Sequence, residues 1–204
     1  MPPSEENPNT VDELAELVNN VSLESTHSRF SSDQDTLFKQ IFDSIKEEFT
    51  NDYILSLRTQ NGQTQRVERN YIKKIETNLK DNGITFKKAG TQQPGDFQKI
   101  NGTTLTIEVK KTDSYVVKCN DTCPSKRMNY IIIYTGNNTF PPQIIMIKGQ
   151  ELRDTSPWVD DYSKKINKIK NEYSKEAIEN PGDISVYARP KYSFNIKRFL
   201  KINN

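Results

Sequence analysis

The sequence predicts an α/β protein whose central mixed β-sheet is flanked by helices on both sides. Short segments in the middle of the chain alternate apolar and polar residues, as strands do. Longer segments before and after them repeat apolar residues every three or four positions, as amphipathic helices do. One segment, residues 128–134, contains Ile131, Ile132 and Ile133 in succession. A strand that is apolar on both faces is expected at the covered centre of a sheet.

Residues 1–32 are rich in Ser, Asn, Glu and Pro, which favours a polar N-terminal arm. Within it, Thr10 and Glu13 form a capping-box pattern that opens a short helix, and this helix could dock on a partner subunit. Residues 33–204 are expected to form a single domain. Its first helix begins at Ser32 or Asp33 and places five apolar side chains on one face, namely Phe38, Ile41, Phe42, Ile45 and Phe49. Residues 50–63 are expected to be a polar connector.

Two further helices are expected from their apolar spacing. Over residues 65–82, apolar side chains recur every four positions, and Gly83 ends the run as a left-handed cap would. A later helix begins at Pro157 and continues through Tyr173. Between and after these helices, strands are expected over residues 84–88, 96–100, 105–111, 128–134, 144–147 and 184–187.

The strands on either side of Asn101-Gly102 are expected to form a hairpin, because Asn-Gly is a strong turn signal. On the second strand, Glu108 and Lys110 point away from the core, since successive side chains alternate between faces. A two-residue turn would pair Asp96 with Ile107 and aim its carboxylate at the wrong face. A longer loop with a bulge would pair Asp96 with Glu108. We therefore expect a bulge or a sharp twist between Asp96 and Leu105.

Pro94-Gly95-Asp96 followed by Glu108-Val109-Lys110 resembles the signature of the PD-(D/E)xK nuclease superfamily. Gly95, inserted between the proline and the aspartate, departs from that pattern. The resemblance implies a nuclease domain over residues 33–204 that hydrolyses phosphodiester bonds in DNA with a metal ion. The alternative is a solvated strand face with an incidental Glu–Lys pair, which would contribute little.

The resemblance implies Asp96, Glu108 and Lys110 as catalytic residues. Magnesium, with manganese able to substitute, would be held by Asp96, Glu108 and the backbone carbonyl of Val109. Lys110 would orient or deprotonate the attacking water. In this superfamily a preceding helix often supplies another acid, for which Glu68 and Glu76 are the candidates, although an acidic residue on an amphipathic helix is more often only solvated.

Composition limits the alternatives. The net charge is +2, but the first fifty residues are acid-rich and the remainder is basic, which suits a phosphate-rich partner. The only histidine is His27, which argues against histidine-dependent nucleases. Cys119 and Cys123 lack the further ligands of a zinc site and are expected to be reduced. There is no glycine-rich phosphate loop, no long apolar run and no secretory signal. We therefore expect an intracellular, cytoplasmic protein without a nucleotide cofactor.

Contacts with double-stranded DNA are expected from basic, hydroxyl and aromatic residues outside the hairpin turn, each of which could touch phosphate rather than a base. The candidates are Lys111, Thr112, Lys126, Arg127, Tyr187, Arg189 and Lys191. The length resembles that of a type II restriction endonuclease, which cuts a short palindrome as a homodimer. A Holliday-junction resolvase of the same superfamily and a catalytically idle DNA-binding protein are the alternatives.

Overall fold

The computed structural model describes residues 33–58, 63–90, 93–120, 123–179, 182 and 191–202. The chain divides into two units, Met1–Gln40 and Ile41–Asn204, and the boundary falls inside the first helix, residues 33–48. The expected N-terminal arm, with its helix at Thr10, and the expected strand over 184–187 lie outside the described residues. The elements described below all belong to the second unit.

A five-stranded mixed sheet forms the centre of this unit, as the sequence predicts. Its strands lie in the order β1-β2-β3-β5-β6, and only the β3–β5 pair is parallel. The strands are β1 (Lys87–Lys88), β2 (Phe97–Gln98), β3 (Ile107–Thr112), β5 (Asn129–Tyr134) and β6 (Gln143–Lys148).

Strand β5 is an inner strand of the sheet, between β3 and the edge strand β6. Ile131, Ile132 and Ile133 are all 0% exposed, so the predicted covered strand is confirmed. On one face of the sheet, Ile132 belongs to a buried cluster with Val117 and Leu152. Because side chains alternate along a strand, Ile131 and Ile133 are buried against the opposite face.

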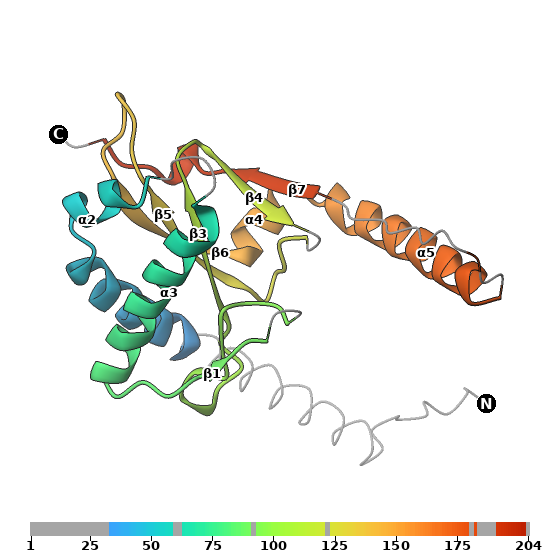
Figure 1. Cartoon of the computed structure of the whole chain (residues 1–204), viewed down its shortest axis with the longest axis horizontal. Helices are drawn as coiled ribbons and strands as arrows, with labels where there is room; N and C mark the ends of the chain where they lie inside the picture. The colour runs from blue at the N-terminus through green and yellow to red at the C-terminus, as the bar shows by residue number, and fades with distance from the viewer. Residues whose placement is uncertain are drawn as a thin grey trace, which may run out of the picture. The chain divides into compact units, whose positions relative to one another are not determined.

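A second, two-stranded sheet is formed by β4 (Val116–Asn120) and β7 (Lys191–Asn195), which run antiparallel. Figure 1 shows these strands side by side as two arrows, β4 in yellow-green and β7 in red. No strand was expected over residues 116–120. There, buried Val117 and Cys119 alternate with polar Lys118 and Asn120, a pattern too short to separate from a turn.

Helices lie on both sides of the five-stranded sheet. On one side, Lys111 Nζ donates to the carbonyl oxygen of Leu57 at 3.1 Å, directly after α2 (Asn51–Ser56). On the other side, Leu152 of α4 (Gly149–Asp154) joins the buried cluster. The expectation of a polar connector over residues 50–63 was therefore wrong at its start, because the Thr50 side chain accepts from the Tyr53 N–H and begins a helix.

The two long helices are α3 (Thr64–Asp81) and α5 (Trp158–Glu179). The predicted apolar face of α3 is buried along its length, at Val67, Tyr71, Ile75 and Leu79. In contrast, α5 keeps large apolar side chains exposed, including Trp158 and Tyr173. None of the helices in the described ranges is long and apolar enough to cross a membrane.

Candidate active site

A β-bulge sets the position of Asp96. The ladder partner of Ile107 is Phe97, yet the backbone N–H of Asp96 also donates to the Ile107 carbonyl oxygen, at 2.8 Å. Asp96, which directly precedes β2, and Phe97 of β2 therefore both lie opposite Ile107 of β3. Two residues opposite one is the arrangement of a β-bulge. The Asp96 side chain accepts from the Val109 N–H at 2.7 Å, so its carboxylate lies beside Glu108. The expected site requires this proximity.

The loop between β2 and β3 is not a two-residue hairpin turn. It contains a 3-10 turn, Ile100–Gly102, and three residues with left-handed backbone, Lys99 (φ 51°), Asn101 (φ 47°) and Gly102 (φ 73°). Asn101 is held in place by Thr85, because its N–H donates to the Thr85 carbonyl oxygen at 2.8 Å and its side chain accepts from the Thr85 N–H at 2.9 Å. The sharp twist expected before Leu105 is therefore present.

The Asp96 carboxylate is anchored on β3. Its Oδ2 accepts a hydrogen bond from the Val109 N–H at 2.7 Å. Burial and the nearby charge of Glu108 raise the pKa of Asp96 to about 6, although the Val109 hydrogen bond and the charge of Lys110 act in the opposite direction. A cation between the two carboxylates would favour the charged form of Asp96, which burial and the charge of Glu108 disfavour.

Glu108 and Lys110 lie on the same face of β3 and form an ion pair. Their side chains are 19% and 29% exposed. Burial acts to lower the pKa of Lys110, but the charge of Glu108, its hydrogen bond and the charge of Asp96 outweigh burial and raise the pKa. In this state Lys110 is therefore protonated at neutral pH, so it can donate hydrogen bonds to a phosphate or a water but cannot accept a proton.

These three residues open into one cleft between α3 and the β1–β3 strands, with a volume of about 880 Å3. Basic side chains line the same cleft, namely Arg69, Lys73, Lys80, Lys88 and Lys110. Three of them, with Glu76, follow one face of α3 at spacings of four, three and four residues. This basic face was not expected from the sequence, although the helical spacing of its charged residues indicates it. The cleft thus combines paired carboxylates with cations suited to phosphate.

The two candidate helix acids differ in their surroundings, although both line the cleft. Glu76 forms ion pairs with Lys80 at 2.8 Å and with Lys88 at 2.7 Å. The hydrogen bond from Lys80, which has the largest effect, and the one from Lys88 lower the pKa of Glu76 to about 2. Glu68 is exposed, has no ion pair with another described residue, and its charge contributes to the raised pKa of Asp96. Of the two, Glu68 is therefore the acid that acts on the Asp96 site.

A metal ion would find hard oxygen donors here. Alternate residues of β3 bond to β5, since the carbonyl oxygen of Thr106 accepts from the Asn129 N–H at 3.1 Å. The N–H and carbonyl of Val109 therefore face the opposite side, where Asp96 lies. Within the described residues, no group of three or more His, Cys, Asp or Glu side chains is arranged to hold a metal ion. Two carboxylates and a carbonyl nonetheless fit magnesium, which keeps several waters and is often completed by phosphate oxygens.

The expected DNA contacts are not gathered in this cleft. Lys111 donates to the Leu57 carbonyl and pairs with Asp113 at 2.9 Å, and its side chain is only 9% exposed. Thr112 is buried and donates to the Val116 carbonyl oxygen at 2.9 Å. These bonds direct both side chains into the fold rather than toward a ligand.

The remaining expected contacts lie elsewhere. Lys126 and Arg127 are exposed, and Lys126 lies 3.8 Å from Asp160. Lys191 is exposed at the start of β7. Tyr187 and Arg189 lie outside the described residues.

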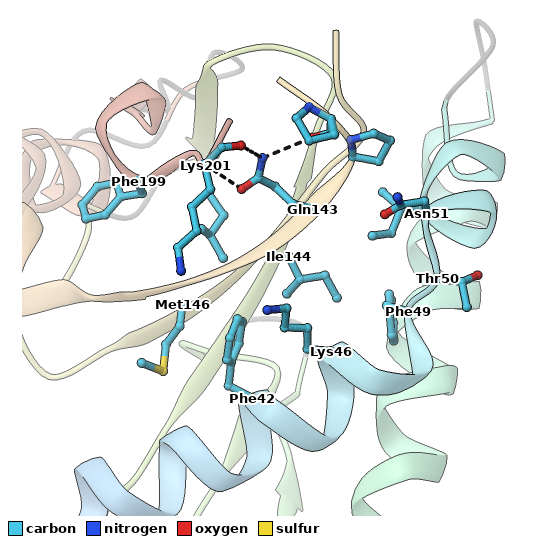
Figure 2. A pocket seen from close by; sticks show the side chains of 14 residues that line it. Phe42, Lys46, Phe49, Thr50, Asn51, Gln143, Ile144, Met146, Phe199 and Lys201 are labelled. Atoms are coloured by element: carbon cyan, nitrogen blue, oxygen red, sulfur yellow. Dashed lines mark hydrogen bonds between the residues drawn. The ribbon is translucent and has the colours of Figure 1, made fainter. Parts of the chain in front are cut away.

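A second cavity, of about 480 Å3, lies beside β6 and is lined mainly by apolar side chains. Figure 2 shows Gln143 at one end, where its amide donates to the Lys201 carbonyl at 3.0 Å and accepts from the Lys201 N–H at 3.0 Å. Lys46 and Lys201 line it, but no carboxylate does. This cavity therefore lacks the groups that hydrolysis or metal binding requires.

No protein-family model, curated protein or solved structure matches this chain.

Proposed function

We propose that the protein is a metal-dependent DNA endonuclease whose catalytic residues are Asp96, Glu108 and Lys110. The observation that supports this most is the bulge at Asp96, which brings its carboxylate beside Glu108 in a cleft that also contains Lys110. A solvated strand face would have no need for a half-buried aspartate with a pKa of about 6. Perturbed carboxylates in a cleft are typical of functional sites.

In this proposal Asp96, Glu108 and the Val109 carbonyl hold magnesium, which supplies Lewis acidity toward a phosphate oxygen and lowers the pKa of a bound water. Lys110 donates hydrogen bonds that orient the attacking water and offset the charge that grows on the phosphate. Because Lys110 pairs with Glu108, the ammonium and a divalent cation would compete for one carboxylate.

The basic face of α3 has a place in the same proposal. Arg69, Lys73 and Lys80 line the cleft that holds the carboxylates. Such side chains would neutralise the DNA backbone and position it without reading its sequence. We further propose that the chain acts as a homodimer on double-stranded DNA and cuts a short palindrome, as type II restriction enzymes do.

The experiment is incubation of the purified full chain with plasmid and phage DNA, in magnesium or in chelator. Lys110→Ala is the test variant, and Lys118→Ala is its matched control because Lys118 is an exposed lysine on β4 that does not line the cleft. Discrete fragments that require magnesium and Lys110, but not Lys118, would support a site-specific endonuclease. Cleavage confined to four-way junctions would replace this with a resolvase. Binding of DNA without cleavage under any condition would favour a non-catalytic DNA-binding protein.

A further inference from the structure

A smaller pocket, with a volume of about 340 Å3, lies where α5 begins and meets β7. Four aromatic side chains line it, namely Trp158, Tyr162, Tyr192 and Phe194. Tyr162 meets both Trp158 and Tyr192 edge to face, with interplanar angles of 69° and 82° and ring centroids 6.2 Å apart in each pair. Trp158 is nevertheless 67% exposed. A rigid aromatic side chain held at the mouth of a pocket offers a flat apolar surface to a ligand.

The wall beneath these rings is fixed by Arg153, which is 8% exposed. Its guanidinium donates to Cys123 Sγ and to the Pro124 carbonyl oxygen at 3.0 Å, and it forms an ion pair with Asp160. Lys126 also lies near Asp160, at 3.8 Å. Asp160 thus has two cationic neighbours, Arg153 and Lys126, so its carboxylate does not make the mouth of the pocket negative.

One basic residue of the pocket remains available for an anion. Lys191 is exposed, lines the pocket and forms no ion pair with any residue that the structure describes. The pocket therefore combines a stacking surface, a fixed floor and an accessible ammonium. A planar base joined to a phosphate carries the complementary groups.

The pocket lies close to the catalytic residues. On the sheet, Glu108 of β3 is the ladder partner of Tyr130 on β5. The ring of Tyr130 packs against Phe194, with centroids 5.6 Å apart, and Phe194 lines the pocket. On the other sheet, Tyr192 is the ladder partner of Cys119, whose thiol is close enough for the charges of Lys110 and Glu108 to act on its pKa. One strand spacing and one ring contact place the Phe194 end of the pocket on the order of 10 Å from Glu108. Trp158 lies at the other end, two further ring contacts away through Tyr192 and Tyr162.

We propose that this aromatic pocket holds an unpaired nucleobase of the DNA strand, stacked on Trp158, a few nucleotides from the phosphodiester that Asp96, Glu108 and Lys110 hydrolyse. This inference rests on the proposed function and adds to it a site for a base outside the double helix. Stacking on an aromatic side chain tolerates any base, because every base has a flat face. A pocket of 340 Å3 is at the small end of ligand sites, which suits one base rather than a peptide segment.

The chain contains one tryptophan, so fluorescence excited where its nine tyrosines do not absorb reports on Trp158 alone. The experiment titrates the full chain, as the Lys110→Ala variant in magnesium, with a short oligothymidylate and with a blunt duplex. Quenching by the oligothymidylate that exceeds quenching by the duplex is the expected result. Equal or absent quenching would overturn the inference. This measurement needs no substitution of a residue that lines the pocket.

A second measurement follows the anisotropy of labelled oligonucleotides. Trp158→Ala is expected to weaken oligothymidylate binding about tenfold and to change duplex binding by less than about twofold. Tyr173→Ala is the matched control, since Tyr173 is also an exposed aromatic residue of α5 but does not line the pocket. Equal losses for the two variants would mean that α5 binds DNA without a specific pocket, which would contradict the inference.

The two proposals fail in different ways. If the wild-type chain cuts no DNA but Trp158 responds to oligothymidylate as described, the nuclease proposal fails and the pocket stands. If the wild-type chain cuts DNA in magnesium but Trp158→Ala binds oligothymidylate as tightly as the wild type, the pocket assignment fails and the nuclease proposal stands.

Discussion

The Asp96 carboxylate accepts a hydrogen bond from the backbone N–H of Val109, at 2.7 Å, across the gap between β2 and β3. A strand N–H that would otherwise need a ladder partner is thus satisfied by a side chain of the neighbouring strand. The same bond holds one carboxylate oxygen against the backbone next to Glu108. Asp96 is therefore positioned by β3 itself, and burial together with the charge of Glu108 raises its pKa.

Asp96→Asn is expected to stabilise the metal-free protein above neutral pH. The ordinary pKa of 3.8 rises to about 6 in the folded state, mainly through burial, so folding favours the protonated form. The stability that this group contributes is fully present below about pH 3.8 and is lost as the pH rises through about 6. An asparagine keeps an oxygen acceptor for the Val109 N–H and carries no charge.

The measurement is urea unfolding in chelator at about pH 5 and about pH 8, with Asp81→Asn, at the exposed end of α3, as the control. The gain of Asp96→Asn over the wild type should be larger at the higher pH, by roughly 1.4 kcal/mol between these two values. A gain that is equal at both values would show that Asp96 ionises as an exposed aspartate does.

Magnesium is expected to raise the melting temperature of the wild-type chain. A ligand that binds only the folded state stabilises it by mass action, and a hundredfold excess over Kd should shift Tm by on the order of 5 °C for a chain of this size. Glu108→Gln should abolish the shift because it removes one of the two carboxylate ligands. Glu76→Gln should keep the shift, since Glu76 is already paired with Lys80 and Lys88. Equal shifts in all three proteins would place the cation elsewhere.

Much of the fold could be predicted because strand patterns depend on local sequence. The apolar run at Ile131–Ile133 and the alternation around Glu108 correspond to β5 and β3. The register of the β2–β3 hairpin could not be fixed in this way. It depends on Lys99 and Asn101, two residues other than glycine with left-handed backbone, and on the contact of Asn101 with Thr85. No local sequence pattern predicts such a loop.

The cleft itself required the tertiary structure. Sequence reasoning could name Glu68 and Glu76 as candidates on α3, but their difference arises from Lys88, which reaches Glu76 from β1 at 2.7 Å. Likewise, the aromatic pocket joins Trp158 to Tyr192, residues that lie far apart in the chain. Contacts between distant segments are set by packing, so they cannot be predicted from composition and periodicity.

The helix acids are expected to differ in activity assays. Glu68→Gln should lower magnesium-dependent cleavage roughly 10- to 100-fold, the usual effect of removing an outer acid of a metal site. Glu76→Gln should lower cleavage by less than about threefold, because Glu76 is committed to two lysines. Initial rates on a supercoiled plasmid measure both. A larger loss for Glu76→Gln would indicate that its lysine pairs position the DNA.

Gly95→Ala is expected to lower both stability and cleavage, and Gly102→Ala to lower stability alone. Both glycines have left-handed backbone, with φ of +81° and +73°, so alanine is strained by about 1 kcal/mol at either position. At Gly95, a Cβ would also lie 2.5 Å from Thr106 Cγ2 and 3.3 Å from the Ile107 carbonyl oxygen. At Gly102, no heavy atom lies within 4 Å of the added Cβ.

The Ile107 carbonyl is also the acceptor for the Asp96 N–H, so pushing it away would disturb the bulge that positions the carboxylate. Unfolding free energies and cleavage rates of the two variants, each relative to wild type, separate strain from displacement. Gly95→Ala should lose at least about tenfold more activity than Gly102→Ala, since small displacements of catalytic groups have large effects on rate. Equal activity of the two variants would mean that the bulge at Asp96 does not set the catalytic geometry.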